Sequence, residues 1–268
     1  MSYISILETL NKLVPPKKVE GRKSPLEYSL AEYGWAQRDY ERYKKILPLE
    51  NKVVLDAGCG LGGRTAYYSE KGAESIVGID MDENHIKYSK EFAVYKNIKN
   101  TSFLVANFID IPLESNHFDV IILNDALEHI RIDYLERALP ELKRVLKPGG
   151  KLFLEFPPWT SPFAAHLYDQ IAIPWCQYLF PERTLIKYIE TKNTGTRLGN
   201  LSSIEHFKEL NRLNKKPFIK LMQKLNFIEL HFQQRIIKNL NFLKVVPILN
   251  EFITNRIVAI YTKKDDDI

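Results

Sequence analysis

The sequence predicts an α/β protein whose sheet is mostly parallel. Short strands that are apolar on both faces alternate with helical segments between residues 52 and 158, as in "KVVLDAG" and "SIVGIDM". Such strands require cover on both faces, and helices in the connections supply it. Two later patterns, "FIELHFQQRI" and "NRIVAIYTKK", indicate strands that close the sheet as an antiparallel pair.

The first 47 residues are expected to form a helical lid segment. A short helix is followed by a loop that contains Pro15, Pro16 and Gly21. A longer helix is then predicted from Ser24, which can cap it, with Pro25 in the first helical position, where its missing N–H costs nothing.

Residues 48–158 are expected to form the ligand-binding core of the protein. Apolar runs of strand length alternate there with longer amphipathic segments. The predicted strands are 52–58, 75–81, 101–108, 118–125 and 151–158, and the predicted helices are 63–73, 83–97 and 135–146.

After Pro158 the alternation stops, and residues 159–224 form an aromatic-rich stretch without a clear strand. We expect an inserted helical cap here, with helices at 162–171 and 204–213, the second of them opened by a capping box of Ser202 and Glu205. Residues 225–268 then supply the last two strands. The apolar segment between these strands, 239–253, is expected to pack on its own domain, although a second subunit or a membrane surface would also suit it.

Bulk properties narrow the choice of partners. The net charge of +5 is spread along 268 residues and forms no basic stripe, which disfavours nucleic acid. Cys59 and Cys176 give neither metal-ligand spacing nor a disulfide framework, so no metal is expected. No secretory signal or membrane span is recognisable, which favours a cytoplasmic location. The oligomeric state is left open.

The stretch "VVLDAGCGLGG" predicts a ligand site at the first turn after a strand. In a parallel sheet, ligands bind beyond the carboxyl ends of the strands, and glycines let them approach bare backbone. Gly58, Gly60 and Gly63 fit the spacing of dinucleotide-binding folds, and Asp80, twenty residues past Gly60, can bind ribose hydroxyls. Enzymes that use NAD share both features.

Asp56 bears on the choice between cofactors. A carboxylate two residues before the first glycine would repel a pyrophosphate but attract a cation. S-Adenosyl-L-methionine has a ribose and an adenine, carries sulfonium and ammonium charges, and has no phosphate. The charges therefore favour this cofactor, while an NAD(P)-dependent oxidoreductase and a non-catalytic cofactor-binding protein remain alternatives.

Four segments in order support the same choice: "VVLDAGCGLGG", "VGIDMD", "VANFIDIPLESNHFDVIILNDALEHI" and "LKPGGKLFLEFP". Over about residues 52–157, the chain resembles the class I S-adenosylmethionine-dependent methyltransferases, and their type 11-like domain in particular. The resemblance and the element order together predict a Rossmann-like doubly wound sheet. This sheet would be mostly parallel with an antiparallel final strand, and a helical cap would be inserted after the fifth strand.

The resemblance implies roles for the residues that match the family's motifs. The loop that contains Gly58, Cys59, Gly60 and Gly62 would wrap the methionine part of the cofactor, and Asp56 would help to hold its amino group.

Further positions match the adenosine part of the site. Asp80 would bind the ribose, Met81 would lie against the adenine, and Asn107 and Phe108 would contact the adenine edge. Aspartate is usual in the family where Asn107 stands, but an amide oxygen can still accept from the adenine amino group. Asn124 would approach the methionine end through its backbone.

Two histidines are candidates for a general base, which methyl transfer requires only if the acceptor must lose a proton. His166 is predicted three residues before Asp169 on one helix face, where the carboxylate could orient it, but a purely structural role is equally compatible. His129 follows the fourth strand, and we favour a structural role for it beside Glu128. The remaining histidines have no supporting neighbours in the sequence: His85, His117, His206 and His231.

The acceptor is expected to be a small molecule, a sugar or a lipid-like metabolite. "NDAL" stands where methyltransferases of exocyclic amino groups carry an Asn-Pro-Pro-aromatic motif, which disfavours DNA and protein amides as substrates. The aromatic cap suits an acceptor with apolar or sugar faces. The sequence thus predicts methyl transfer by in-line displacement, to oxygen in preference to nitrogen or carbon.

Overall fold

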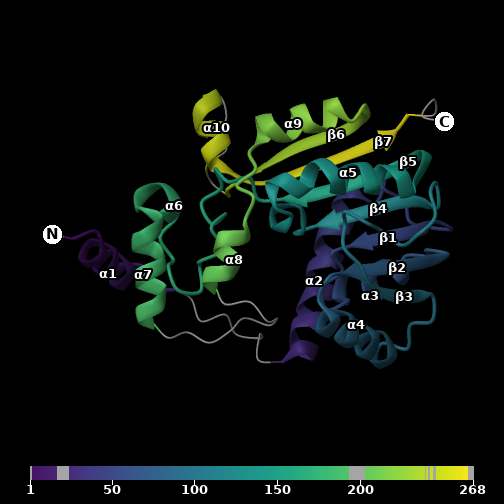
Figure 1. The fold of residues 1–268 in the computed structure, drawn as a ribbon, viewed down its shortest axis with the longest axis horizontal. Helices are drawn as coiled ribbons and strands as arrows, with labels where there is room; N and C mark the ends of the chain where they lie inside the picture. Colours follow the sequence, from purple (N-terminus) through teal and green to yellow (C-terminus); the bar gives the residue numbers. More distant parts are fainter. Residues whose placement is uncertain are drawn as a thin grey trace.

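The computed structural model describes residues 2–16, 24–192, 203–238, 240, 242–243 and 246–264. The described residues build a seven-stranded sheet in the order β3-β2-β1-β4-β5-β7-β6 (Figure 1). Its strands are β1 (Val53–Ala57), β2 (Ser75–Asp80), β3 (Thr101–Val105), β4 (Phe118–Asn124), β5 (Leu146–Phe156), β6 (Phe227–Ile236) and β7 (Thr254–Lys263).

The strand directions confirm the predicted fold class. β1 pairs in parallel with β2 and β4, and the parallel pairing extends to β3 on one side and β5 on the other. β7 lies between β5 and β6 and is antiparallel to both. The order reverses direction beside β1, so the carboxyl ends of β1 and β4 form the switch point where such sheets bind ligands.

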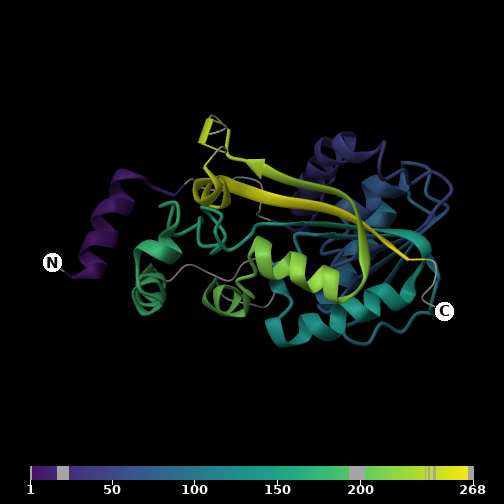
Figure 2. The ribbon, with the colours of Figure 1, turned by 90° about the horizontal axis from the view of Figure 1, so that it is seen from above.

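Helices cover both faces of the sheet (Figure 2). Successive residues of a strand point to opposite faces, so Leu55 joins one apolar cluster and Val54 the other. The first cluster packs under α5 (Ile132–Val145) and α9 (Lys215–Lys224).

The second cluster packs under α2 (Pro25–Tyr43) and α3 (Gly63–Ser69), and α4 (Glu83–Tyr95) contacts both of these helices. The cap prediction for α2 is confirmed, because Ser24 accepts a hydrogen bond from Glu27 N and Pro25 opens the helix.

A cap with its own apolar cluster follows β5. It contains α6 (Cys176–Leu179), α7 (Glu182–Lys192) and α8 (Ser203–Glu209). The first helix of the chain, α1 (Tyr3–Leu13), packs against this cap beside α7 (Figure 1). Asn11 on α1 donates a hydrogen bond to Gln170 O at 2.7 Å and another to Tyr188 Oη at 2.8 Å.

The helix predicted at 162–171 is wrong. This stretch forms successive turns, and His166 has a left-handed backbone with φ of 55°. Backbone bonds of single turns replace a helical ladder here, such as His166 N to Phe163 O and Gln170 N to Leu167 O. Just before this stretch, side chains bond to the backbone: Gln177 donates to Trp159 O and Ser161 O, and the Trp175 indole donates to Thr160 O. α7 and α9 were not predicted.

Two further predictions concern the cap and the last connection. The predicted 204–213 helix is present as the shorter α8, whereas Ser202 of its capping box lies outside the described residues. Within the 239–253 segment, α10 (Pro247–Ile253) meets the cap, because Trp175 Nε1 donates to Phe252 O. None of the helices in the described ranges has the length and apolarity needed to span a membrane.

Candidate functional site

The glycine-rich turn between β1 and α3 is fixed to the neighbouring strand β2. Gly58 N and Cys59 N both donate to Ile79 O, at 2.8 and 3.0 Å. Gly58 has φ of 79°, a left-handed value, and a Cβ added to it would lie 2.6 Å from Ala126 Cβ. A side chain there would therefore be strained and would clash, whereas at Gly60 the nearest atom lies 3.4 Å from the added Cβ. Gly60 also has a left-handed φ, of 52°, and its N–H and C=O are bonded to Asp80 and to Ser89 Oγ, so both glycines shape the turn.

Asp80, at the carboxyl end of β2, connects this loop to α4. Its carboxylate accepts from Gly60 N at 3.1 Å, from Asp82 N at 3.0 Å and from His85 Nδ1 at 3.2 Å. A carboxylate offers about four acceptor positions, so capacity remains for a ribose hydroxyl. Burial opposes protonation of His85, but its hydrogen bond to Asp80 and the nearby acidic charges outweigh burial and raise the pKa of His85. His85 thus has the neighbours that the sequence did not reveal.

The residues expected around the adenine lie beside the same loop. The Met81 side chain is 73% exposed and leaves a flexible apolar surface next to Asp80. The Phe108 ring also lies close to Gly58: its Cζ is 3.5 Å from the position that a Cβ on Gly58 would take. Asn107 uses its side-chain oxygen to accept from Ile109 N at 3.2 Å, which shapes the turn after β3.

Two buried carboxyl groups lie next to the loop. Asp56, at the carboxyl side of β1, accepts a 2.6 Å hydrogen bond from Thr65 Oγ1. Glu32, on α2, accepts from Gly63 N at 3.3 Å. Burial raises the pKa of Asp56 to about 6 and that of Glu32 to about 7. Glu32 was missed in the sequence because nothing in its local pattern distinguishes it from the other acids of an amphipathic helix.

Cys59, although part of the loop, directs its side chain away from the ligand face. Its thiol is buried in a small cluster with Ile86, Ala93 and Phe103, and burial raises its pKa well above the usual value. Any part that Cys59 takes in cofactor binding is therefore through its backbone.

The carboxyl end of β4 supplies the polar groups on the methionine side. The side-chain oxygen of Asn124 is buried and has no hydrogen-bond partner. The next residue, Asp125, pairs with Arg64 at 3.0 Å and with Arg256. An orphaned buried acceptor, two buried carboxyl groups and the remaining acceptor capacity of Asp80 together fit a cofactor that brings an ammonium group and ribose hydroxyls.

Three histidines gather on the cap side of this edge. His129 stands in η1 (Leu127–His129), directly after β4, and His166 and His206 come from the cap. The ring centroids of His129 and His206 are 4.5 Å apart, and those of His129 and His166 are 5.1 Å apart. The two candidate bases are thus brought together, but His166 lies on a turn, so the helix that was predicted to place it on one face with Asp169 is wrong.

Glu128 lies under the histidines. It is 4% exposed, and one carboxylate oxygen is 3.9 Å from Nε2 of both His129 and His166. Burial raises the pKa of Glu128 to about 8. His206 has the closest ring contact in the cluster. No neighbour in the sequence supported this, because its partners are distant in the chain.

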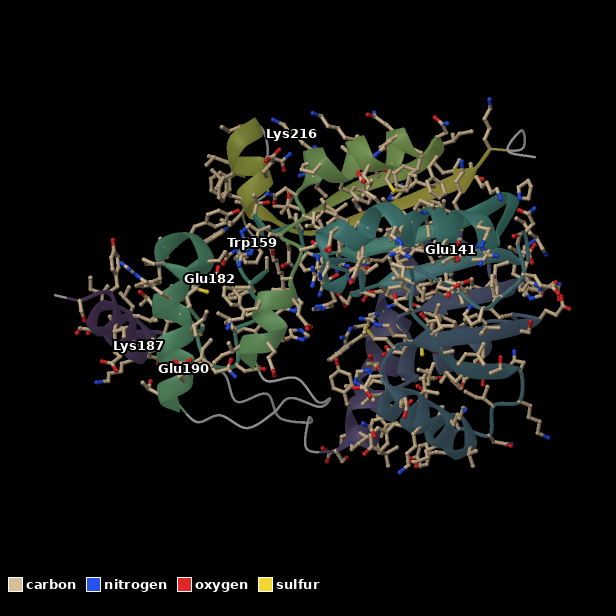
Figure 3. All side chains as sticks on the ribbon, in the orientation of Figure 1. Glu141, Trp159, Glu182, Lys187, Glu190 and Lys216 are labelled. Atoms are coloured by element: carbon tan, nitrogen blue, oxygen red, sulfur yellow. The ribbon has the colours of Figure 1, made fainter. Side chains whose placement is uncertain are left out.

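Aromatic side chains surround the junction of cap and sheet. Trp159 lies there (Figure 3), tilted against Phe207 with ring centroids 6.3 Å apart. Arg212 stacks over the Trp159 ring at 5.2 Å. Tyr168 contacts His166 at a centroid distance of 6.5 Å, so the acceptor side of the cluster carries a ring that is only partly buried.

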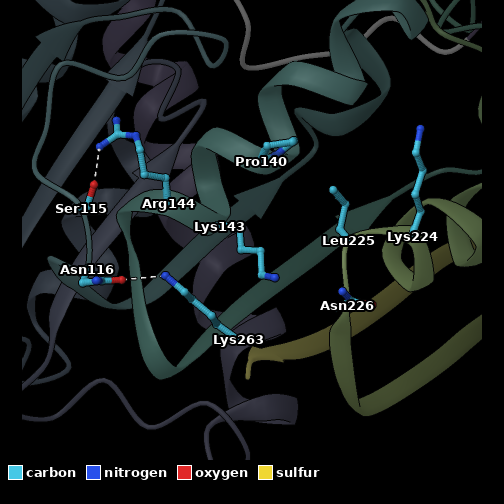
Figure 4. A pocket seen from close by; sticks show the side chains of 9 residues that line it. All are labelled: Ser115, Asn116, Pro140, Lys143, Arg144, Lys224, Leu225, Asn226 and Lys263. Atoms are coloured by element: carbon cyan, nitrogen blue, oxygen red, sulfur yellow. Dashed lines mark hydrogen bonds between the residues drawn. The ribbon is translucent and has the colours of Figure 1, made fainter. Parts of the chain in front are cut away.

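A surface depression of about 500 Å³ lies at the opposite edge of the sheet (Figure 4). Lys143, Arg144 and Lys263 are among its lining residues, but Arg144 pairs with Glu141 and Lys263 donates to Asn116 Oδ1 and Leu146 O. It borders the amino ends of the parallel strands and is therefore not the cofactor site.

Similarity to known proteins covers the part of the chain that contains this site. The sequence model of the methyltransferase domain family, described as "Methyltransferase domain", matches residues 55–154. This range contains the glycine loop, Asp80 and the strand that ends at Asn124. Residues 55–154 therefore match the kind of methyltransferase domain that the sequence motifs resemble. S-Adenosyl-L-methionine is the cofactor of this domain, as the sequence predicted.

Similar proteins come from several methylation pathways. The chain is 31% identical over 160 residues to the sterol 24-C-methyltransferase erg6 of Schizosaccharomyces pombe, an alignment that covers 50% of the chain and 42% of the relative. It is 29% identical over 167 residues to the mitochondrial ubiquinone biosynthesis O-methyltransferase of Dictyostelium discoideum, with 55% and 51% covered. The chain thus spans about half the length of these curated relatives.

Solved structures share the fold. An S-adenosylmethionine-dependent methyltransferase from Methanosarcina mazei superposes with a TM-score of 0.58 at 21% identity and covers 83% of this chain and 98% of its own. The geranyl diphosphate C-methyltransferase of Streptomyces coelicolor also reaches 0.58, at 15% identity, with 85% and 77% covered. These likenesses agree with the mostly parallel sheet and its antiparallel strand.

Proposed function

We propose that the chain transfers the methyl group of S-adenosyl-L-methionine to a small, largely apolar acceptor, and that it does so at oxygen. The glycine turn that Asp80 anchors at Gly60 N, with the carboxyl groups of Asp56 and Glu32 buried beside it, carries the proposal. A pyrophosphate would meet negative charge there, whereas an ammonium group would be stabilised.

The cofactor supplies an electrophilic methyl group on a sulfonium, whose departure as a neutral thioether requires no acid. The chain's own residues then have to align the acceptor with that methyl group. Asp80 orients the ribose end, Asp56 and Glu32 favour the cationic amino-acid end, and Asn124 and Asp125 border the position of the reacting centre. His166 is the proposed base, because it stands on the cap side of the carboxyl edge.

The aromatic junction supports the proposed acceptor class. Tyr168 is half-buried beside His166 and can offer a flat apolar face to a ring or an isoprenoid-like chain. Of the relatives named above, one methylates a sterol at carbon, and the other is an O-methyltransferase of ubiquinone biosynthesis. We place the activity in the cytoplasm, where the buried thiols of Cys59 and Cys176 would stay reduced.

Calorimetry with S-adenosylhomocysteine and, separately, with NADH tests the cofactor. Saturable binding of the first and none of the second is the expected result, and the reverse would replace the methyltransferase with an oxidoreductase. A panel of hydroxylated sterols, quinols, phenols and sugars with labelled S-adenosylmethionine then tests the acceptor. Tight cofactor binding with no labelled product from any acceptor would favour a non-catalytic role.

A further inference from the structure

The three histidines of the cap edge form a cluster with the dimensions of a metal site. His129, His166 and His206 each offer a ring nitrogen, and these nitrogens lie within 4.8 Å of one another. Each of the three side chains is partly buried, and the ring centroids are 4.5 to 5.6 Å apart. The three histidines come from separate segments of the chain, so the fold and not a local sequence motif brings them together.

Glu128 adds a possible oxygen ligand to the three imidazoles. Its oxygen is 3.9 Å from Nε2 of two of the histidines, and neither of its carboxylate oxygens has a hydrogen-bond partner. With 4% exposure and no hydrogen-bond partner at either side-chain oxygen, this carboxyl group is costly to ionise, because its desolvation is not compensated. A cation between it and the histidines would remove that cost.

The surrounding structure holds the cluster together. Asn211, which follows α8, donates from its side chain to Leu127 O at 2.7 Å and to Ile130 O at 3.0 Å. Asn211 N also donates to Glu128 O at 2.9 Å. These three bonds fix the end of the helix that carries His206 against the short turn that carries His129.

We propose that His129, His166 and His206 bind a divalent transition-metal ion, with Glu128 as the fourth ligand. Imidazole and carboxylate together suit zinc and its neighbours in the first transition row. Zinc–nitrogen bonds of about 2.0–2.1 Å put the nitrogens of a tetrahedral site about 3.4 Å apart, so the cluster would contract by about 1 Å on binding. Rotation of partly exposed imidazole rings can supply this movement.

The ion would border the acceptor side of the methyl-transfer centre, since η1 follows β4 and His166 follows β5. This consequence rests on the proposed function, whereas metal binding itself does not. With the ion bound, His166 is a metal ligand and not the base proposed above, because a ring nitrogen that binds a metal ion cannot accept a proton. The expectation that the protein needs no metal, which the lack of cysteine spacing supported, would then be wrong.

Titration of the chelator-treated full chain with Zn²⁺ tests the site. We expect one tightly bound equivalent, which raises the midpoint of thermal unfolding, and visible d–d bands typical of tetrahedral coordination when Co²⁺ replaces Zn²⁺. His206→Gln should weaken binding at least about tenfold, and Glu128→Gln about 10–100-fold. The matched control is His117→Gln, an exposed histidine at the other edge of the sheet, which should bind as the wild type does.

Equal Zn²⁺ affinity in the wild type and His206→Gln would overturn the proposal, as would a Co²⁺ spectrum typical of octahedral hydrated ion. Circular dichroism and S-adenosylhomocysteine affinity should stay unchanged in His206→Gln, which shows that the variant is folded. Because the metal is measured without an acceptor, failure of the metal site and failure of the methyltransferase proposal give different results.

Discussion

The sheet core and the cap hold their backbones in place by different means. In the core, parallel ladders satisfy the backbone, and the glycine loop is joined to β2 by main-chain bonds from Gly58 and Cys59 to Ile79 O. In the cap, side chains do much of this work, as with Gln177, Trp175 and Asn211. Periodic backbone structure leaves a periodic trace in the sequence, whereas side-chain bonds to distant carbonyls leave none.

The largest effect is expected from adding a side chain to the glycine loop of the core. Gly58→Ala should destabilise the protein by about 3 kcal/mol, because a left-handed residue with a Cβ is strained and this Cβ would overlap Ala126. Urea unfolding followed by circular dichroism measures the change. Gly34→Ala is the control, since its Cβ meets nothing within 4 Å in the middle of α2, and it should stabilise by about 0.5–1 kcal/mol. Unchanged stability in Gly58→Ala would argue against the loop geometry.

Asp80→Ala addresses ligand binding in the same region. The affinity for S-adenosylhomocysteine should fall by about 1.5–3 kcal/mol in free energy, the value of hydrogen bonds to a charged group. Isothermal calorimetry gives the change directly. Glu83→Ala, an exposed acid in the first turn of α4, should bind as the wild type does. If Asp80→Ala bound normally, the ribose would have to lie elsewhere.

Asn211→Ala makes the corresponding test in the cap. It removes the donors to Leu127 O and Ile130 O, so the unfolding free energy should fall by about 1–3 kcal/mol. Cofactor affinity should change little, because the glycine loop is held by its backbone bonds to Ile79 O on β2 and not by the cap. Asn84→Ala, exposed on α4, is the control for loss of an asparagine. A large loss of cofactor affinity in Asn211→Ala would show that cap and core are energetically one unit.

The pH dependence of binding sharpens the role of the buried acids. The pKa values of Asp56 (about 6) and Glu32 (about 7) lie above the usual range, so both groups are mostly protonated at pH 5.5. An ammonium group prefers them ionised, so affinity for S-adenosylhomocysteine should rise from pH 5.5 to 7.5, by about tenfold for one proton released. In the unliganded protein, Glu32 acts in the opposite sense: stability falls as pH rises from 4.5 to about 7.

Glu32→Gln should flatten both pH profiles, because the amide does not titrate. Glu41→Gln, an exposed acid on the same helix, provides the comparison. Calorimetry at several pH values and denaturant titrations would measure the two effects, and a profile unchanged by Glu32→Gln would remove this residue from the cofactor site.

The sequence predicted the seven strands and most of the cofactor loop because each depends on neighbours in the chain. The bend of Gly58 and the acid after β2 lie in short, patterned segments. Glu32 and His206 were missed because their neighbours come from other elements and only the fold brings them close. His85 was missed because its bond to Asp80 depends on how α4 turns back toward the end of β2. The turn structure around His166 was also missed, because backbone bonds of single turns, such as His166 N to Phe163 O, replace the helix that was expected from the local residues.

β7 fills the gap between β5 and β6, although the whole cap separates it from β5 in the sequence. During translation, β5 therefore emerges from the ribosome long before its partner and has an unpaired edge while the cap is being synthesised. Open strand edges recruit other strands, so a nascent chain of this kind is exposed to mispairing over that interval. We expect chaperone dependence of its biosynthesis to be greatest in that interval and to cease once β7 has joined the sheet.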